Sequence, residues 1–373
     1  MDTEVLKINP EKPESKKLSK AAQIIIQGGL VAFPTETVYG IASRVTKDSL
    51  KRLDELKNRK PDKYYSLHIG YKQQVNRYVP SVPLRAKKLI ENCWPGPLTI
   101  VFRLNEYDLE RKKKDLHKDL FRNLYKGGSI GIRCPENRIA SALLSSIEGP
   151  VVAPSANVAA QPPAVNPEQV IENFSGKVEM IIDGGICKYK KSSTVVKVNR
   201  GNIDIIRKGA YSPEKINELS RIQFLFVCTG NTCRSPMAEG MLKKHLSEKI
   251  GCKVDELEKM GYKVISAGML NLKGAPASFE SITACVDRNI DISSHKSRSL
   301  TLDLILKSDF IYGMSHEHCE RIIHMCPEAS EKCSLLAPGR NIPDPIGQPQ
   351  QVYDKCADLI EEAVKNRLSE MQL

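Results

Sequence analysis

The sequence lacks the features that mark membrane, secreted and repeat proteins. No apolar run approaches membrane-spanning length, and the N-terminus has no hydrophobic core of a signal peptide. There is also no internal repeat of solenoid period and no low-complexity tract. We therefore expect a cytoplasmic protein with no membrane partner, and 373 residues predict two or three globular domains.

A disulfide framework is absent as well. The eleven cysteines are odd in number and follow no small-domain spacing. Disulfides are also rare in cytosolic proteins. Most of these thiols should therefore be reduced and buried.

Positive charge is concentrated in the first part of the chain. Residues 1–220 carry 37 Lys and Arg against 24 Asp and Glu, whereas residues 221–373 carry 19 against 20. A basic surface attracts RNA, anionic membranes or polyphosphates, although a solvated Lys-rich face explains it equally well. The change in charge coincides with a turn-rich polar stretch, so we place a domain boundary near residues 212–223. Residues 104–128, the most charge-dense stretch, predict an exposed helical insertion.

The segment VCTGNTCRSP begins at Val227, at the end of an apolar strand-like run, and leads into a helix start with Pro236 near its first turn. Backbone N–H groups and the helix dipole converge at such a strand-to-helix turn and bind anions. A cysteine there is stabilised as a thiolate, and an arginine can hold two phosphate oxygens. Cys228 and Arg234 therefore predict attack by sulfur on a bound phosphoryl group.

The leaving group in such a reaction needs a proton. Asp344, in the loop IPDPIG, is the candidate acid because a loop side chain can project over a pocket mouth. A structural Asp-Pro turn is the alternative.

Five motifs in this order resemble the low-molecular-weight protein tyrosine phosphatases: Cys-x5-Arg-Ser, SAG at 266–268, DISSHKSRSL at 291–300, SDFIYGMSHEH at 308–318 and DPIG at 344–347. The resemblance spans residues 223–373 and implies a four-stranded parallel sheet flanked by helices. It implies a phosphocysteine on Cys228, phosphate binding by Arg234, and Asp344 as acid and then base. The implied phosphate loop comprises Thr229, Gly230, Asn231, Thr232, Cys233 and Ser235.

The loop residue Thr232 bears on which phosphate is bound. CTGNTCRSP resembles bacterial protein-arginine phosphatases, whereas phosphotyrosine enzymes usually have an aliphatic residue there. A hydroxyl can contact a guanidinium, whereas isoleucine packs on an aromatic ring. We therefore favour a phosphoarginine protein substrate, with phosphotyrosine as the alternative. Ile346 follows Asp-Pro, where those arginine phosphatases usually have an aromatic residue.

Arsenate reductase is a further alternative on the same scaffold, because that family relays oxidation through a downstream cysteine pair. Cys319 and Cys326 have a suggestive spacing, but Met314 stands where the first relay cysteine would fall. Cys233 either forms a reversible disulfide with Cys228 or merely fills the loop. The His- and Cys-rich residues 315–333 match no zinc-ligand spacing, so we expect no metal there.

In the first part of the chain, short apolar strands repeatedly end in Ser, Thr, Asn or a basic residue. This pattern suits an open α/β sheet whose strand ends line a cationic cleft for a polyphosphate. Neither a Walker loop nor G-x-G-x-x-G is present, so side chains would hold any nucleotide.

Five motifs in succession (PTETVYG, Lys-x-Arg, WPGPLT, PSAN and STVV) resemble the YrdC-like L-threonylcarbamoyladenylate synthases. The resemblance implies an open twisted sheet over residues 10–212. It also implies condensation of L-threonine, bicarbonate and ATP to L-threonylcarbamoyladenylate and pyrophosphate, the first step toward N6-threonylcarbamoyladenosine at position 37 of tRNA. The implied partners are tRNA-modification proteins, and an RNA-binding factor without this activity is the alternative.

The resemblance also implies the site residues of this first domain. The ATP-binding positions, with Mg²⁺ accompanying the nucleotide, are Lys57, Arg59, Ser155, Asn157 and Arg207. The positions around threonine are Thr35, His68, Arg133 and Ser193. The chain departs from the family where its usual Pro-Leu is Tyr64-Tyr65.

Overall fold

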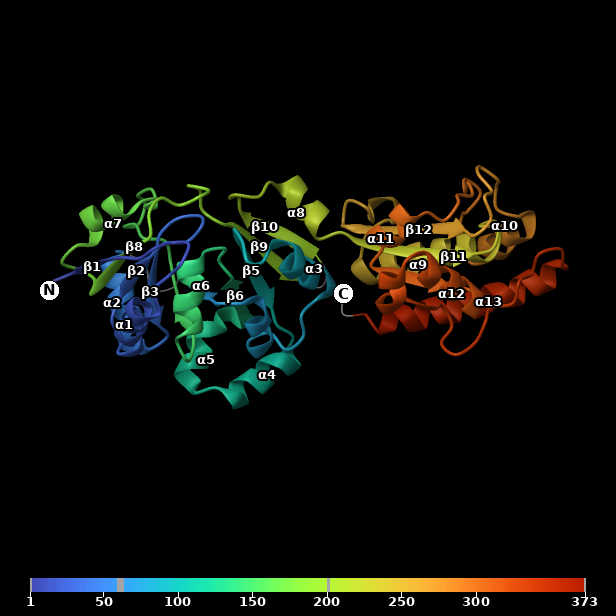
Figure 1. Ribbon diagram of the computed structural model, residues 1–373. Coiled ribbons are helices and arrows are strands. Elements are labelled where there is room, and N and C mark those ends of the chain that lie inside the picture. Colours follow the sequence, from blue (N-terminus) through green and yellow to red (C-terminus); the bar gives the residue numbers. More distant parts are fainter. Residues whose placement is uncertain (1, 59–63, 200–201, 372–373) are drawn as a thin grey trace. The chain divides into compact units, whose positions relative to one another are not determined.

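The computed structural model describes residues 2–58, 64–199 and 202–371. The chain divides into two compact units, Met1–Leu219 and Ser220–Leu373, each with its own sheet and core (Figure 1). Among the described residues, no helix is both long enough and apolar enough to cross a membrane.

Unit 1 contains a ten-stranded mixed sheet in the order β1-β8-β2-β3-β7-β4-β6-β5-β9-β10. The strands are β1 (Glu4–Lys7), β2 (Val31–Phe33), β3 (Gly40–Arg44), β4 (Ser66–His68), β5 (Leu98–Arg103), β6 (Ser129–Arg133), β7 (Val151–Val152), β8 (Met180–Asp183), β9 (Thr194–Asn199) and β10 (Asn202–Arg207). Some neighbouring strands are parallel and others antiparallel, so the predicted open α/β sheet is confirmed as a mixed sheet.

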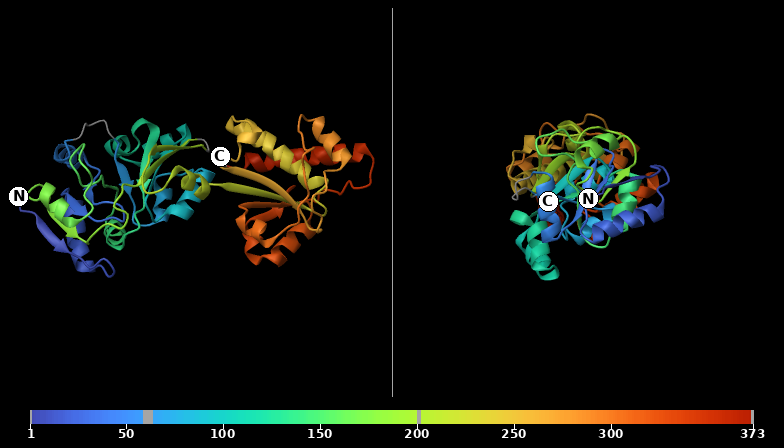
Figure 2. Two further views of the ribbon diagram at one scale, coloured as in Figure 1. Left: turned by 90° about the horizontal axis from the view of Figure 1, so that it is seen from above. Right: turned by 90° about the vertical axis from the view of Figure 1, so that its left-hand side faces the viewer.

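The helices of unit 1 lie against this sheet (Figures 1 and 2). They are α1 (Ser15–Ile26), α2 (Lys47–Leu56), α3 (Leu84–Cys93), α4 (Glu106–Asp115), α5 (Lys118–Leu124), α6 (Arg138–Ser145), α7 (Pro167–Phe174) and α8 (Pro213–Leu219), with 3-10 turns η1 (Lys72–Arg77) and η2 (Lys126–Gly128). Helices α1 and α6 bury their apolar faces on β2 and β8 in one core cluster, and α3 packs in a larger cluster under β5 and β6. The charge-dense stretch predicted as an exposed helical insertion forms α4 and α5.

The alternation of side chains along β4, β6 and β5 determines where a site can form. Leu67, Ile132 and Ile100 belong to the larger core cluster. Because successive strand residues point to opposite faces, the adjacent His68, Arg133 and Thr99 point to the other face. Register places the last three side by side, since Arg133 is paired with both His68 and Thr99. A row of polar side chains thus crosses three strands.

Unit 2 contains a four-stranded, wholly parallel sheet in the order β12-β11-β13-β14, as predicted (Figure 1). The strands are β11 (Ile222–Cys228), β12 (Tyr262–Gly268), β13 (Phe310–Gly313) and β14 (Cys333–Leu335). The helices are α9 (Arg234–Ile250), α10 (Phe279–Val286), α11 (Leu302–Lys307), α12 (His316–Met325) and α13 (Gln350–Ser369), with 3-10 turns η3 (Val254–Glu256) and η4 (Pro327–Glu331). The long helices α9 and α13 pack together, while α11 and α12 contribute to a core cluster on β11 and β13.

The stretch that the sequence predicts as a polar linker contains α8, which packs against α3 of unit 1. Arg85 donates a 3.2 Å hydrogen bond to Asn217, and Asn92 donates one of 2.8 Å to the Leu219 carbonyl. The division between the units falls directly after this helix.

Candidate functional site

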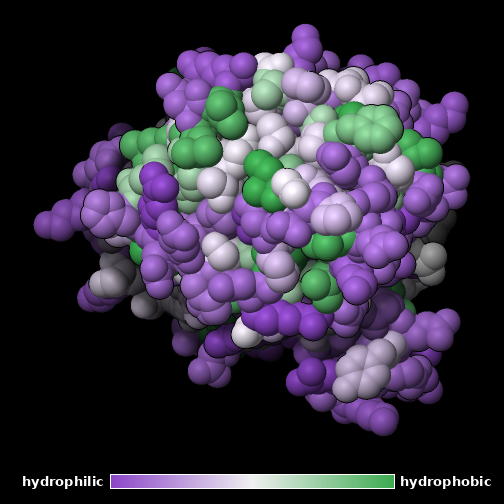
Figure 3. Space-filling model, turned by 90° about the vertical axis from the view of Figure 1, so that its right-hand side faces the viewer, coloured by the Kyte–Doolittle hydropathy of each residue, from purple (hydrophilic) through white to green (hydrophobic). Residues whose placement is uncertain are grey.

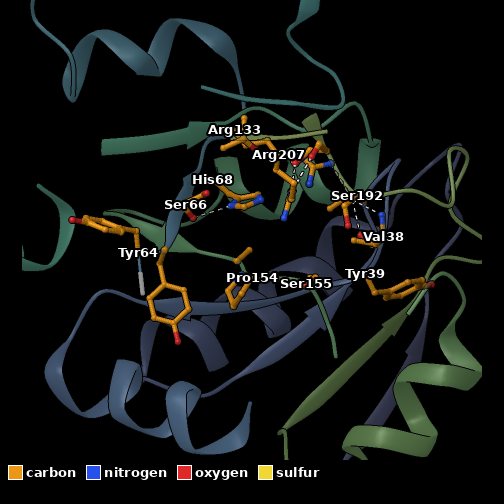
Figure 4. Close-up of a pocket in the computed structure, with 16 residues that line it drawn as sticks. Val38, Tyr39, Tyr64, Ser66, His68, Arg133, Pro154, Ser155, Ser192 and Arg207 are labelled. Carbon is orange, nitrogen blue, oxygen red and sulfur yellow. Dashed lines mark hydrogen bonds between the residues drawn. The ribbon is translucent and has the colours of Figure 1, made fainter. Parts of the chain in front are cut away.

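A cavity of about 160 Å³ lies over the polar row of unit 1 (Figure 4). Its lining includes six of the residues predicted for the first domain: Thr35, His68, Arg133, Ser155, Ser193 and Arg207. Figure 4 shows the Arg133 and Arg207 side chains close together beside His68. Segments far apart in sequence therefore meet at one cationic, hydroxyl-rich surface.

Arg133 is held by the turn that follows β2. Its Nη2 atom donates to Glu36 Oε1 at 2.9 Å, to Thr37 Oγ1 at 2.5 Å and to Thr35 Oγ1 at 3.3 Å. Arg133 is 6% exposed and Glu36 is 2% exposed, so the ion pair is buried. Arg133 Nε and Glu36 Oε2 are buried without a hydrogen-bond partner among the described residues. The guanidinium is thus fixed and neutralised yet incompletely satisfied.

Neither Glu36 nor Thr37 was predicted to have a role, although both lie within the motif PTETVYG. An unpaired buried arginine is costly, and a single carboxylate offsets its charge. The signal that could have identified Glu36 is the need of Arg133 for a counter-ion, but the strand pattern does not say which acid supplies it.

His68 presents a neutral ring to the cavity. Burial, reinforced by the charge of Arg133, lowers the pKa of His68 to about 3. Its Nδ1 lies 3.1 Å from the Ser66 carbonyl, which can only accept, so Nδ1 carries the proton. Nε2 is therefore left as an acceptor for an N–H or O–H group of a ligand.

This lowered pKa predicts how the stability of unit 1 depends on pH. Unfolded histidine binds a proton near pH 6.5 and buried His68 does not until about pH 3, so acidification through this window favours unfolding. We expect wild type to lose up to about 1.4 kcal/mol per pH unit more than His68→Gln between pH 6 and 4. Trp94, the only tryptophan, is buried in unit 1, so its fluorescence during urea unfolding reports on this unit. Equal pH dependence in the two proteins would contradict the prediction.

Arg207 and Ser193 also line the cavity. Arg207 donates to the Ser193 carbonyl at 2.9 Å and to its hydroxyl at 3.0 Å, and that hydroxyl lies 3.0 Å from Thr99 Oγ1. The antiparallel pairing of β9 and β10 brings this arginine back beside the start of β9. The result is a second fixed guanidinium on the same surface.

Two other predicted ATP-binding residues do not line the cavity in the described structure. The Lys57 ammonium is buried and donates to the carbonyls of Ser155 and Asn157. Asn157 in turn accepts from the Ser155 hydroxyl at 2.5 Å. Lys57 thus holds the loop after β7, which carries Ser155 on its cavity side. Arg59, also predicted to bind ATP, lies outside the described residues.

A second cavity of about 520 Å³ adjoins the first and shares Tyr64, Tyr65, Ser66 and Arg207 with it. It continues along the same face of the sheet. Its floor is apolar where Val101, Gly131 and Val195 lie, and it ends at Arg103 and Lys197. The residues of this floor and of this end of the cavity were not predicted as site residues, because each occupies an ordinary strand position in the sequence. No Asp or Glu among the described residues lines either cavity.

In unit 2, Cys228 ends β11 and its sulfur receives hydrogen bonds from the loop that follows. The Asn231 N–H donates to Sγ at 3.2 Å, and Ser235 Oγ lies 3.0 Å from Sγ. Because the Asn231 amide donates to Ser235 Oγ at 2.9 Å, the Ser235 hydroxyl is free to donate to the sulfur. Two donors aimed at one sulfur stabilise a thiolate.

Asn231 braces the loop in a left-handed conformation, with φ of 57°. Its side chain donates to Ser266 at 2.8 Å and accepts from the Arg298 N–H at 2.9 Å. Ser266 donates in turn to the buried Glu239 at 2.6 Å. The motif SAG therefore contacts the loop through Ser266, and the motif DISSHKSRSL contacts it through Arg298.

Arg234 forms an ion pair with Asp344, which lies on a loop 110 residues later. Its other Nη donates to the Ile342 carbonyl at 3.1 Å, and its buried Nε has no partner among the described residues. The side chains of Arg234 and Asp344 thus lie beside the loop that follows Cys228. Asp344 is about one-third exposed, at 37%, whereas Arg234 is buried.

Thr229 and His318 extend this network, although His318 was not predicted to belong to the phosphatase site. Arg234 donates to Thr229 Oγ1 at 3.3 Å, which lies 3.1 Å from His318 Nε2. Burial and the charge of Arg234 lower the pKa of His318 to about 4. His318 is therefore neutral near pH 7 and accepts from Thr229 at Nε2, while its Nδ1 lies 2.9 Å from Ser315 Oγ.

Thr232 and Cys233 complete the loop. The Thr232 hydroxyl and a methyl of Leu272 both lie within 4 Å of the Cβ position that Gly230 lacks, so both lie beside this glycine. The Cys233 sulfur lies 3.6 Å from the Ser278 hydroxyl and 3.7 Å from that of Tyr353. The end of the unit where the strands terminate carries scattered apolar patches among polar ones (Figure 3). Leu272 and Ile346 are exposed apolar residues of this unit.

No group of three or more His, Cys, Asp or Glu side chains in the described part of the chain is arranged to hold a metal ion. Mg²⁺ usually takes carboxylate ligands together with phosphate oxygens. The described lining of the two adjoining cavities supplies hydroxyl, imidazole, ammonium and guanidinium groups but no carboxylate for such a ligand set.

Comparisons with known proteins divide the chain at the same place as the structure. Residues 23–209 match a family model of the Sua5, YciO and YrdC proteins, described as "Telomere recombination". Residues 223–373 match the family described as "Low molecular weight phosphotyrosine protein phosphatase".

Individual relatives resemble the first unit. The chain is 33% identical over 239 residues to the threonylcarbamoyl-AMP synthase of Pyrococcus abyssi, covering 63% of this chain and 66% of that protein. It is 31% identical over 201 residues to that of Bacillus subtilis, covering 54% and 55%. A solved structure of a Sua5 variant from P. abyssi matches with 26% identity and a TM-score of 0.50, over 71% of this chain and 92% of that one. The chain therefore belongs to the Sua5, YciO and YrdC family and joins to that domain a domain of the low molecular weight phosphotyrosine protein phosphatase family.

Proposed function

We propose that unit 1 condenses L-threonine, bicarbonate and ATP to L-threonylcarbamoyl-AMP and pyrophosphate, as the first step of a tRNA modification. The observation that carries this proposal is the row of His68, Arg133 and Thr99, which places fixed polar groups over a cavity of amino-acid size. The names of the two relatives support the same reaction.

The two adjoining cavities suit the two larger substrates. Sites for cofactor-sized ligands are usually about 300–1,000 Å³, so the cavity of about 160 Å³ suits threonine and that of about 520 Å³ suits a nucleotide. Arg133, with two hydroxyls beside it, would bind the threonine carboxylate, and His68 Nε2 would accept from the threonine amine or hydroxyl. The apolar floor of the second cavity would contact the base, and Arg207 lies where the two cavities meet.

The reaction then needs orientation and charge neutralisation more than a protein nucleophile. The threonine amine adds to the bicarbonate carbon and water leaves, which gives a carbamate. A carbamate oxygen attacks the α-phosphorus, and pyrophosphate leaves with the P–O bond electrons. Arg207 and Ser193 would hold the phosphate as charge moves to the leaving group, and Ser155 would contact the nucleotide on the loop that Lys57 supports.

Pyrophosphate release tests this proposal. The full chain with ATP, bicarbonate and threonine should release pyrophosphate, and release should require both threonine and bicarbonate. An RNA-binding factor without this activity would instead release none and would bind RNA tightly with strong salt dependence. That result would reject the synthase proposal.

We propose in addition that unit 2 is a cysteine-dependent protein phosphatase. The carrying observation is that two donors converge on the Cys228 sulfur while Arg234 and Asp344 stand at the same loop. Phosphate would bind the loop N–H groups and Arg234. Asp344 would then release Arg234, take up a proton and donate it to the leaving nitrogen or oxygen, while the S–P bond forms and the bond from phosphorus to that leaving atom breaks. In the second step Asp344 would take a proton from the water that attacks phosphocysteine, the S–P bond would break, and inorganic phosphate and the Cys228 thiolate would be released.

Within this proposal we favour phosphoarginine as substrate on account of Thr232, whose hydroxyl lies beside Gly230 of the loop. Thr232→Ile should move the preference toward phosphotyrosine by about 10- to 100-fold in the ratio of kcat/KM values, because a polar contact to the guanidinium is replaced by an apolar one. The measurement offers both phosphorylated side chains to each variant. Thr283→Ile is the matched control, since that hydroxyl donates only back to its own helix at Phe279. An unchanged ratio in Thr232→Ile would contradict the assignment.

The arsenate reductase alternative has a specific obstacle. Cys319 and Cys326 are seven residues apart on α12 and its end, or about 10 Å along a helix axis. That separation prevents a direct disulfide without unwinding of the helix. Arsenate-dependent oxidation of thiols by the purified chain would nevertheless favour the reductase over the phosphatase.

A further inference from the structure

The segment from Ser315 to Cys333 carries three cysteines that the proposed phosphatase does not use. The structure separates them into two kinds. Cys326 is 5% exposed and belongs to the core cluster under α12, whereas Cys319 and Cys333 are partly exposed. The latter two come from different elements, α12 and β14, that pack on the same strand.

The strand β13 brings these two thiols together. Gly313 has no side chain, and the Cys319 sulfur lies 2.6 Å from where its Cβ would be, so this thiol occupies the space that the glycine leaves. On the neighbouring edge strand Cys333 is paired with Ile311, two residues before Gly313. Residues two apart on a strand share a face, and Ile311 belongs with Ile322 of α12 to one core cluster. Cys333 therefore points to the face on which Cys319 lies, and α12 and β14, the elements that carry the two thiols, also pack against each other.

This contact makes the two sulfurs chemically different. Hydrogen bonding from Cys333 lowers the pKa of Cys319 to about 7, although burial acts to raise this pKa. The same interaction raises the pKa of Cys333. Buried Cys285 and Cys356 show the opposite behaviour, since burial raises the pKa of each thiol to about 12. A larger fraction of Cys319 than of an ordinary thiol is then thiolate at neutral pH, and the thiolate is the nucleophilic form.

We propose that Cys319 and Cys333 are a site of reversible oxidation, at which a hydroperoxide converts the two thiols to a disulfide that joins α12 to β14. The Cys319 sulfur attacks the peroxide oxygen, so an S–O bond forms, the O–O bond breaks and the departing hydroxide takes a proton to become water. The Cys333 sulfur then attacks the sulfenic sulfur, so the S–S bond forms, the S–O bond breaks and a second water leaves. Two thiols lose two electrons and one peroxide gains them.

The proposal depends on neither proposed activity, and the sequence makes its test direct. Trypsin cleaves after Lys307, Arg321, Lys332 and Arg340, so Cys319, Cys326 and Cys333 fall on the separate peptides 308–321, 322–332 and 333–340. The full chain carrying Cys228→Ser, which removes the reactive thiol of the loop, is treated with hydrogen peroxide, alkylated without reduction and digested.

We expect peptide 308–321 joined to 333–340, two hydrogens lighter than the sum, and its disappearance after treatment with dithiothreitol. Peptide 322–332 should remain alkylated. Cys319→Ala and Cys333→Ala should each abolish the joined peptide, whereas Cys326→Ala, the matched control, should retain it. A bridge from Cys319 to Cys326, full alkylation of both thiols after peroxide, or oxidation of Cys319 beyond the sulfenic acid without a bridge would overturn the proposal.

A second measurement uses the reduced protein and needs no oxidant. Iodoacetamide at pH 7 should alkylate Cys319 several-fold faster than Cys252, another partly exposed thiol, whose pKa is raised by burial and by nearby carboxylates. Cys333→Ala should slow alkylation of Cys319 at pH 7 and have little effect at pH 9.5. An unchanged rate at pH 7 in Cys333→Ala would show that the two thiols do not interact.

Discussion

Replacing Cys228 with serine is expected to abolish phosphatase turnover while pyrophosphate release by unit 1 continues. The hydroxyl keeps the contacts to Asn231 and Ser235 but is a far weaker nucleophile than a thiolate held by two donors. Loss of a catalytic nucleophile costs about a thousand-fold or more in kcat. The measurement follows phosphate release from a phosphorylated protein and pyrophosphate release from ATP with the same preparation.

Cys285→Ala is the matched control for this variant. Cys285 is fully buried in α10 and burial raises its pKa to about 12, so it is not nucleophilic near neutral pH. Phosphate release should stay within about two-fold of wild type. Substantial turnover in Cys228→Ser would exclude the phosphocysteine, and joint loss of both activities would show that the two units are coupled.

The loop around Cys228 shows how far sequence reasoning reaches when function and local structure coincide. An apolar strand, a turn with Cys and Arg, and a helix start with Pro are contiguous, so their geometry follows from strand and helix signals alone. The proximity of Arg234 to Cys228 was predictable on that basis, whereas the four-stranded parallel sheet was implied only by the resemblance to the phosphatase family. Asp344 was predicted as an acid from its loop and from the family resemblance, but its ion pair with Arg234 was not predicted, because no local pattern joins residues 110 apart.

The contacts that the sequence did not predict are those between side chains of separate elements. Lys57 was predicted as a nucleotide ligand, yet its ammonium donates to two backbone carbonyls of the loop after β7, and only the fold shows that these carbonyls lie within reach. Likewise the spacing of Cys319 suggested Cys326 as its partner, whereas strand register selects Cys333. Spacing describes neighbours along one element, but register and packing decide neighbours between elements.

We expect Arg133→Ala to give the largest loss of synthase activity for any single change in the cavity of unit 1. Two effects add. The variant loses a charge-assisted contact to the threonine carboxylate, worth about 2–4 kcal/mol or roughly 30- to 1,000-fold in kcat/KM for threonine. It also leaves Glu36 buried without a counter-ion, which destabilises a protein by about 3–5 kcal/mol. Trp94 fluorescence during urea unfolding measures the second effect in the full chain.

A double variant separates these two effects. Arg133→Met with Glu36→Gln removes both charges, so no buried carboxylate is left unpaired and most of the lost stability should return. Threonine-dependent pyrophosphate release should nevertheless stay low, because no guanidinium meets the threonine carboxylate. Phosphate release by unit 2 serves as an internal control and should be unchanged in both proteins.

The activity and stability of the double variant distinguish two roles of Arg133, both of which are compatible with its contacts. Its Nη2 is occupied by Glu36, Thr35 and Thr37, which is what a purely structural ion pair requires. Its Nε has no partner among the described residues, and its side chain lines the cavity beside His68, which is what a ligand-binding arginine requires. Recovery of threonine-dependent activity in the stable double variant would reduce Arg133 to a counter-ion for Glu36. Restored stability without restored activity would assign it to the threonine carboxylate, with Glu36 as the residue that positions it.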